Sequence, residues 1–228
     1  MGFKLGAVPF HMWVPDTYQG APTPFVAFLS VAPKAAGMAV MVRVLVEGFG
    51  HMRLVWWPAL VFVCIVTLLL GNLFALPQKN VKRLLGYSGI AHVGLLLLAF
   101  GINTHEGATA LLFYLLAYVF MNMGAFLVTE VVGQGESADM APWTGLSRRS
   151  PALAFAMLLF LLSLSGIPFV AGFWAKVFLF MAAWKAGMTG LVILGAILSV
   201  VALFYYMSIG RCIYIADAEA DAAPVKTG

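Results

Sequence analysis

Charged residues are scarce in this sequence. Only 10% of the 228 residues are Asp, Glu, Lys or Arg, whereas 63% are hydrophobic. A typical soluble domain carries about 25% charged residues, so this composition excludes an ordinary soluble domain. The length corresponds to several membrane-spanning helices. We therefore predict an all-α, polytopic membrane protein, and we attribute the net charge of +4 to membrane topology rather than to binding of nucleic acid.

Sequence motifs for cofactors are missing as well. The two cysteines, Cys64 and Cys212, stand far apart and form no CxxC pair, which gives no basis for an iron–sulfur cluster, a zinc site or a redox-active thiol pair. Neither a GxGxxG nor a P-loop pattern is present, so no nucleotide site is indicated. We expect no metal and no cofactor to be bound by this chain, and any redox chemistry to belong to other chains.

The N-terminus lacks the pattern of a signal peptide, because residues 1–10 are short, apolar and interrupted by Pro9. We interpret it as the inside of a membrane segment and expect the chain to be a fragment of a longer protein.

Acidic residues are absent from the middle of every apolar segment. All nine lie in loops, at segment ends or in the tail; they are Asp16, Glu47, Glu106, Glu130, Glu136, Asp139, Asp217, Glu219 and Asp221. A lysine buried in the membrane therefore has no carboxylate partner at its own depth, so it is either largely neutral or paired with a group outside this chain.

What remains is a series of seven apolar segments. They are expected at residues 1–14, 25–49, 54–76, 84–102, 108–132, 151–184 and 191–215. Three prolines and a glycine in Pro15–Pro24 argue against a continuing helix there. The acidic, small-residue tail Ala216–Gly228 is expected to be disordered.

Prolines interrupt two of these segments, at Val8–Phe10 and at Ser165–Pro168. Paired broken segments are typical of transporters built from inverted repeats. Free backbone groups at a break must bond to protein or water, which creates a wet spot where a lysine can titrate. Ordinary proline kinks are the alternative.

Lys34 lies inside the apolar segment 25–49. It is roughly 13 Å from Phe25 and a similar distance from Arg43, which is too far for its side chain to reach the membrane surface easily. A charge at that depth costs about 2.5–3.5 kcal/mol on insertion scales. Such a residue is a functional candidate, and the alternative is a structural lysine bonded to helix carbonyls.

His92 and Lys176 are the other ionisable residues at membrane depth. A lone histidine often serves only as a hydrogen-bonding residue between helices, and the nearby helix break offers carbonyls to Lys176. Lys4, in the first broken segment, is ambiguous from sequence alone.

Basic residues predict the orientation. The loops that follow residues 76 and 132 carry Lys79, Lys82, Arg83, Arg148 and Arg149. The alternate loops hold Arg53 and Lys185. The positive-inside rule places the more basic loops, and with them Pro15–Pro24 and the tail, in the cytoplasm.

Three motifs resemble a known family. They are KLGAVPFHMWVPDTYQGAPTP at residues 4–24, NVKRLLGYSGIAH at 80–92, and LSGIP with GFWAK at 164–168 and 172–176. Together they are similar to the antiporter-like subunits of respiratory complex I, in particular the subunit N branch and its mitochondrial counterpart. The resemblance covers nearly the whole chain except the tail. Leu95, Phe169 and Ala175 depart from the family pattern.

The resemblance implies roles for four residues. Lys4 is similar to the lysine of the family's first broken helix, and Lys34 to the lysine that connects it onward. His92 is similar to the histidine between two half-channels, and Lys176 to the lysine of the second broken helix. The family's carboxylate partner for the first lysine belongs to a helix that this sequence does not contain.

The resemblance also implies an organisation and a function. Residues 1–49 would end one five-helix repeat, 50–215 would form the second, and 216–228 a polar tail. The expected function is that of a proton-translocating subunit of NADH–quinone oxidoreductase, a respiratory-chain translocase, in the bacterial inner membrane. NADH, FMN, iron–sulfur clusters and quinone would belong to partner subunits, and lipids and other membrane-arm subunits would be the partners.

Two alternatives remain open. One is a subunit of a multisubunit cation/proton antiporter or of a membrane-bound hydrogenase. The other is a structural membrane subunit that moves no protons.

Overall fold

The computed structural model describes residues 1–133 and 139–216, and helices dominate this part of the chain. In chain order they are α1 (Gly2–Leu5), α2 (Trp13–Gly20), α3 (Thr23–Met41), α4 (Arg53–Ala75), α5 (Val81–Ile102), α6 (His105–Gly133), α7 (Leu146–Arg149), α8 (Pro151–Ser165), α9 (Ala171–Lys185) and α10 (Thr189–Tyr214). A π-helical stretch, η1 (Val42–Gly48), continues α3, and short 3₁₀ turns lie at η2 (Gly50–Met52) and η3 (Ala141–Trp143).

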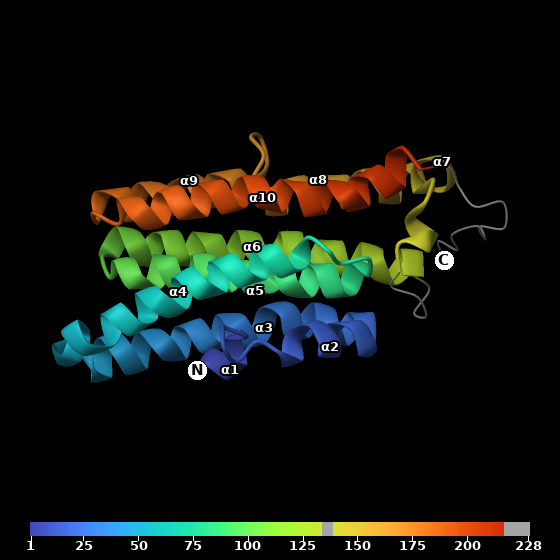
Figure 1. The fold of residues 1–228 in the computed structure, drawn as a ribbon. Helices are drawn as coiled ribbons and strands as arrows, with labels where there is room; N and C mark the ends of the chain where they lie inside the picture. The colour runs from blue at the N-terminus through green and yellow to red at the C-terminus, as the bar shows by residue number, and fades with distance from the viewer. Residues whose placement is uncertain (134–138, 217–228) are drawn as a thin grey trace.

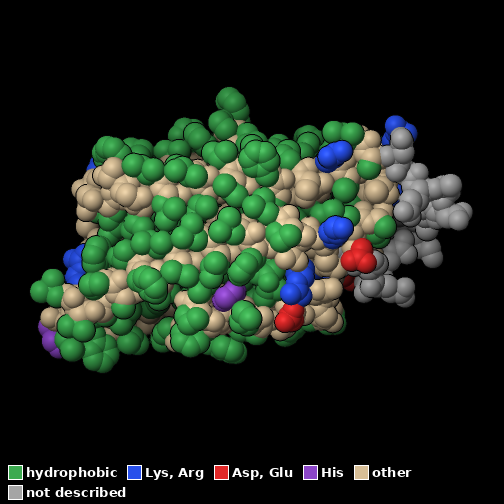
Figure 2. All heavy atoms as spheres, viewed as in Figure 1, with side chains coloured by type: hydrophobic (Ala, Val, Ile, Leu, Met, Phe, Trp, Pro, Cys, Tyr) green, Lys and Arg blue, Asp and Glu red, His purple; other side chains and the backbone are tan. Residues whose placement is uncertain are grey.

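The long helices run side by side along one axis (Figure 1). Within the described residues, five stretches are long and apolar enough to cross a membrane: Thr23–Gly48, Gly50–Ala75, Val81–Ile102, His105–Gly133 and Thr189–Tyr214. The shorter α8 and α9 follow one another along the same axis. Hydrophobic side chains cover most of the long flank that Figure 2 shows, as expected for a surface that faces lipid or other apolar helices.

Helix α5 forms the centre of the bundle. Nearly all of its residues are buried, because α4, α6 and α2 pack around it. Its start is fixed by Asn80, whose side-chain oxygen accepts the backbone N–H of Arg83 at 3.0 Å. Asn103 ends it in the left-handed conformation. This cap is a common way to satisfy the first free donors of a helix, and it fixes the position of His92 along the bundle axis.

The prediction that Pro15–Pro24 is irregular is wrong in its first half, because α2 includes Pro15. Pro15 lies in the first turn of the helix, where a backbone N–H has no helical partner, so a proline costs little there. Pro24 likewise lies in the first turn of α3. Both prolines therefore begin helices rather than prevent them.

Both predicted helix breaks are confirmed. Residues 6–12 separate α1 from α2, and residues 166–170 separate α8 from α9. At the second break Gly166 adopts the left-handed conformation, with φ of 84°. The segment 151–184 is therefore two helices in line, joined by a short loop that projects from the bundle (Figure 1).

The other predicted boundaries agree with the structure to within about three residues at each end. The polar connection 133–150 contains the short elements η3 and α7, which the sequence analysis did not predict. Glu136 and most of the tail, residues 217–228, lie outside the described residues. The division into two repeats remains a prediction.

Candidate functional site

Lys34 is buried where α3 meets α5 and α6. Only 3% of the residue is exposed, and its ammonium donates to the Gly89 carbonyl at 2.9 Å and to the Tyr118 hydroxyl at 3.0 Å. A Cβ on Gly89 would lie 2.7 Å from the lysine nitrogen, so the glycine makes room for the amine. Helices α3, α5 and α6 thus hold the Lys34 amine at a fixed position.

A second polar pair lies one turn from Lys34. The Asn122 amide donates to the Ser30 hydroxyl at 2.7 Å, and Ser30 donates to the Ala27 carbonyl. All of these groups are buried. The contact between α3 and α6 is therefore polar over more than one turn, although both helices are strongly apolar in sequence.

His92 lies at the centre of a cluster of hydroxyl groups. Its Nδ1 is 2.7 Å from the Tyr114 hydroxyl and its Nε2 is 3.3 Å from the Tyr206 hydroxyl. The Tyr206 hydroxyl in turn is 2.5 Å from the Ser88 hydroxyl. The Tyr118 ring, whose hydroxyl binds Lys34, packs 5.1 Å from the imidazole ring. We call His92, Ser88 and these three tyrosines the His92 cluster.

Lys176 is placed by the break between α8 and α9. It is 6% exposed, and its ammonium donates to the Ser165 carbonyl at 2.7 Å. The last carbonyls of a helix have no partner within that helix, so the end of α8 supplies an acceptor. Gly166 allows this approach, because a Cβ there would lie 2.7 Å from Lys176 Cδ.

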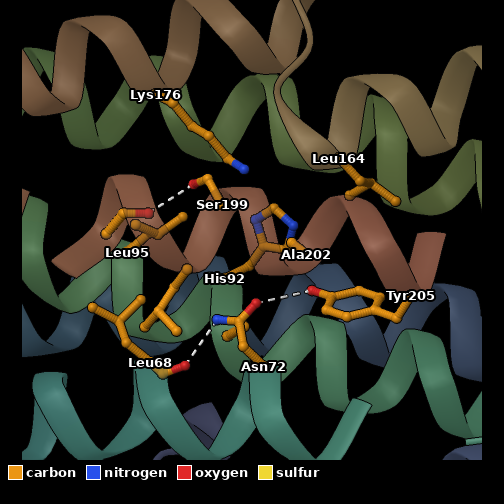
Figure 3. A pocket seen from close by; sticks show the side chains of 12 residues that line it. Leu68, Asn72, His92, Leu95, Leu164, Lys176, Ser199, Ala202 and Tyr205 are labelled. Atoms are coloured by element: carbon orange, nitrogen blue, oxygen red, sulfur yellow. Dashed lines mark hydrogen bonds between the residues drawn. The ribbon is translucent and has the colours of Figure 1, made fainter. Parts of the chain in front are cut away.

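A small cavity of about 10 Å³ lies between Lys176 and the His92 cluster. Figure 3 shows the lysine amine pointing toward the side on which the imidazole ring lies. Three further polar side chains line the cavity, namely Asn72, Ser199 and Tyr205. A cavity of this size with several polar groups has room for about one water molecule.

The polar lining is held in place by its own hydrogen bonds. Tyr205 donates its hydroxyl to the Asn72 side-chain oxygen at 3.2 Å, and the Asn72 amide donates to the Leu68 carbonyl at 2.8 Å. Ser199 donates to the Gly195 carbonyl at 2.8 Å. One Asn72 N–H and the Ser199 oxygen therefore remain able to bond to a molecule in the cavity.

The structure brings together three of the four residues predicted from the sequence. Lys34, His92 and Lys176 lie around the same central helices, whereas Lys4 lies on the surface of α1. The Lys4 side chain forms no hydrogen bond or ion pair within the part of the chain that the structure describes. Its predicted role remains a prediction.

Carboxylates stay at the ends of the bundle. Arg83 pairs with Asp16 at 2.5 Å, and Lys185 pairs with Glu106 at 3.0 Å. The partners of Lys34 and Lys176 are carbonyl and hydroxyl oxygens. Residues 1–133 and 139–216 also contain no cluster of three metal-ligating His, Cys, Asp or Glu side chains.

Sequence reasoning missed the hydroxyl groups of the site. Tyrosine counts as a hydrophobic residue in an apolar helix, so Tyr114 and Tyr118 gave no polar signal. A signal was nevertheless present, because Ser88 with His92, and Tyr114 with Tyr118, are spaced four residues apart and so share one helix face. Asn72 in the segment 54–76 was a further polar residue at membrane depth.

Comparison with known proteins agrees with this fold. A relative from Solibacter usitatus, NADH-quinone oxidoreductase subunit N 2, is 45% identical over 94% of this chain and 44% of its own length. Among solved structures, a chain of respiratory complex I from Thermus thermophilus superposes with a TM-score of 0.84 at 38% identity, covering the whole of this chain and 49% of the other. The chain spans about half the length of the relatives it matches.

A chain of the Mrp complex from Dietzia has the same fold. It superposes with a TM-score of 0.90 over 98% of this chain and 42% of its own, at 24% identity. The sequence similarity to that chain is too low to bear on function. The family model described as NADH:quinone oxidoreductase/Mrp antiporter, TM, matches residues 1–202. The chain therefore belongs to the NADH:quinone oxidoreductase/Mrp antiporter transmembrane family.

Proposed function

We propose that this chain moves protons through the membrane arm of an NADH–quinone oxidoreductase. The observation that carries the proposal is the enclosure of Lys34, His92 and Lys176 in one bundle, each bonded to oxygen atoms of neutral groups. Each can bind or release a proton without separating from a carboxylate. An ionisable group at membrane depth is costly, and three of them around common central helices are typical of a proton pathway.

His92 is suited to pass a proton from one ring nitrogen to the other. Both of its nitrogens face tyrosine hydroxyls, and a hydroxyl can either donate or accept a hydrogen bond. The surroundings therefore support either neutral tautomer as well as the protonated ring. A proton accepted at one nitrogen can leave from the other while the ring stays in place.

The lysines act on this centre through charge. In a dry interior two like charges at short range repel strongly, so a proton on one lysine disfavours a proton on its neighbour in the line. A change at Lys34 is in this way transmitted to the His92 cluster and on to Lys176. The Tyr118 hydroxyl at Lys34 and the cavity beside Lys176 are the two places where a proton crosses between these groups.

The proposal also covers Lys4, the orientation in the membrane, the partners and the two repeats. Lys4 serves as the first member of the line. The more basic helix ends, at the start of α5 and at α7, face the cytoplasm of a bacterial inner membrane. Other membrane-arm subunits and lipids are the partners, and the chain itself holds no redox cofactor. Residues 1–49 and 50–215 belong to two repeats.

The test is proton pumping in the assembled enzyme. Lys34→Ala and Lys176→Ala are expected to lower the number of protons pumped per electron, and Lys79→Ala serves as a control because it removes an exposed loop lysine. Complex abundance is measured in the same membranes. Unchanged pumping in both variants at normal abundance contradicts the proposal.

A structural role is the second candidate, because Lys34 and Lys176 each donate to a backbone carbonyl. It predicts that the same substitutions lower the abundance of the complex while each complex that forms pumps normally. An antiporter or hydrogenase subunit is a further alternative, because the family model that matches this chain also covers Mrp antiporters. Copurification with quinone-reductase subunits separates it from the proposed function.

A further inference from the structure

A groove opens between α6 and α9 at the end of the bundle opposite the basic loops. Its volume is about 320 Å³, far larger than the cavity beside Lys176. Aromatic and aliphatic side chains form its walls, chiefly Phe113, Phe178 and Met181, while polar residues stand at the helix ends. It lies on the outside of the bundle, away from the proton site.

A second groove lies on the other side of α9, toward α10. Its volume is about 410 Å³, and Phe180, Trp184 and Val192 are among the residues that line it. Met181 and Lys185 line both grooves. These two side chains are four residues apart and lie on one face of α9, so they form a ridge from which the two grooves diverge. We call the two grooves together the forked groove.

The head of the forked groove carries both signs of charge. Lys185 donates to both carboxylate oxygens of Glu106 at 3.0 Å, and the two side chains are 61% and 57% exposed. Glu106 lies in the first turn of α6 and Lys185 ends α9. These helix ends meet at the left of Figure 1, at the depth where spanning helices leave the membrane. Trp184 beside them is a residue type enriched at that depth.

The depth of the first groove follows from the helix spacing. Phe113 comes seven residues after Glu106, and Phe178 comes seven before Lys185. At 1.5 Å per residue, each ring lies about 10 Å along its helix from the charged residue of that helix. The two rings meet edge to face at 5.4 Å and close the bottom. The groove is therefore a short apolar channel with a charged pair at its mouth.

We propose that the forked groove binds one phospholipid with a zwitterionic amino headgroup. The phosphate binds Lys185, the headgroup ammonium binds Glu106, and one acyl chain enters each groove. The fork favours a lipid over a helix of a partner protein, because a helix is a single rod whereas a phospholipid has one head and two tails. The pair of opposite charges favours a zwitterionic head over a purely anionic one, because an anionic head would leave Glu106 facing a like charge.

The experiment measures lipids retained by the assembled complex. The complex is purified from membranes that contain phosphatidylethanolamine and phosphatidylglycerol, and bound lipid is quantified by mass spectrometry. Lys185→Gln and Glu106→Gln are expected to lower retained phosphatidylethanolamine by about fivefold, the effect of losing one exposed charge contact. Lys79→Gln, an exposed lysine away from the groove, is expected to change nothing.

A third variant tests the groove without touching the charges. Thr109→Phe places a ring on an exposed residue of the first groove and is expected to lower lipid retention while the complex assembles normally. A density map of the complex supports the proposal if it shows two chains that diverge at Met181. Equal retention in all variants, retention of phosphatidylglycerol alone, or a protein helix over both grooves overturns it. Proton pumping is measured in parallel, since the lipid site and the proton line can fail independently.

Discussion

The two helix breaks of this chain differ in what surrounds their lysines. Both begin at a left-handed glycine, Gly6 with φ of 73° and Gly166 with φ of 84°. Lys4 stands beside the first break on the surface, whereas Lys176 follows the second break and is buried, with its amine on the Ser165 carbonyl. A break frees backbone groups in both places, but only the lysine beside the second is enclosed by other helices of this chain.

The difference shows that a broken helix alone does not enclose a lysine. Helices α5, α6, α8 and α10 pack against one another or against α9, which carries the buried Lys176. Helix α1, which carries Lys4, packs mainly on α3, and Phe3, Phe10 and Met12 near it remain exposed. Enclosure removes water and leaves defined hydrogen-bond partners, which is what allows a lysine to bind a proton at a fixed place.

The largest expected effect separates the two lysines. In the assembled complex, Lys176→Met is expected to slow pumping by at least about tenfold, as loss of a proton-transfer group does, and to change stability because the Ser165 carbonyl loses its donor. Lys4→Met is expected to slow pumping without changing stability, because Lys4 makes no bond within the described residues. Pumping and thermal unfolding are measured together. A loss of stability in Lys4→Met together with normal pumping would contradict this prediction, because Lys4 would then serve the fold rather than proton transfer.

A pair of glycines tests whether the second break positions its lysine. Gly166→Ala and Gly187→Ala both place a side chain at positive φ, 84° and 79°, which costs about 1–2 kcal/mol. At Gly187 the new Cβ meets nothing within 4 Å, whereas at Gly166 it meets Lys176. Both variants are therefore expected to lose stability, and Gly166→Ala to lose more because it pushes Lys176 away from the Ser165 carbonyl. Only Gly166→Ala is expected to lose pumping. Equal pumping in the two would show that the exact position of Lys176 is unimportant.

A second pair of glycines tests the enclosure of Lys34 on α5. Gly89→Ala is expected to push the Lys34 amine off the Gly89 carbonyl, a charged hydrogen bond worth about 1.5–3 kcal/mol. Gly86→Ala meets only ordinary contacts of 3.4 Å and more, and is expected to gain up to about 1 kcal/mol from helix propensity. Pumping is expected to fall in the first variant alone. Normal pumping in Gly89→Ala would mean that the Lys34 contact does not serve proton transfer.

The smallest effect is expected from the cavity beside Lys176. Ser199→Ala removes one polar group of its lining, and is expected to slow pumping by a few-fold, about 1 kcal/mol, with a changed solvent deuterium isotope effect. Ser208→Ala is the matched control, because Ser208 lies on the same helix and also donates to a backbone carbonyl, that of Tyr205. An identical isotope effect in both variants would exclude the cavity from the pathway.

Much of the fold and the core of the site could be predicted from the sequence. Lys34, His92 and Lys176 stand out because a titratable residue in an apolar helix is costly, and Pro168 marks the second break. The start of α2 was missed because the effect of Pro15 depends on its position within a helix turn. The cavity was missed because its lining combines residues as distant as Asn72 and Ser199, which only helix packing brings together.

The exposure of Lys4 was also outside the reach of sequence reasoning. Its surroundings in the chain, a proline break and a short apolar segment, match those of Lys176. Only the packing of the neighbouring helices distinguishes a surface lysine from an enclosed one.

A double-mutant cycle on Lys34 and Lys176 tests the central claim most directly. Protons pumped per electron are measured in vesicles for the assembled enzyme, for Lys34→Ala, for Lys176→Ala and for the double variant. Groups that act in series on one pathway lose function non-additively. The account predicts that the double variant pumps as many protons per electron as whichever single variant pumps fewer. Losses that multiply, or single variants that pump normally, would contradict it.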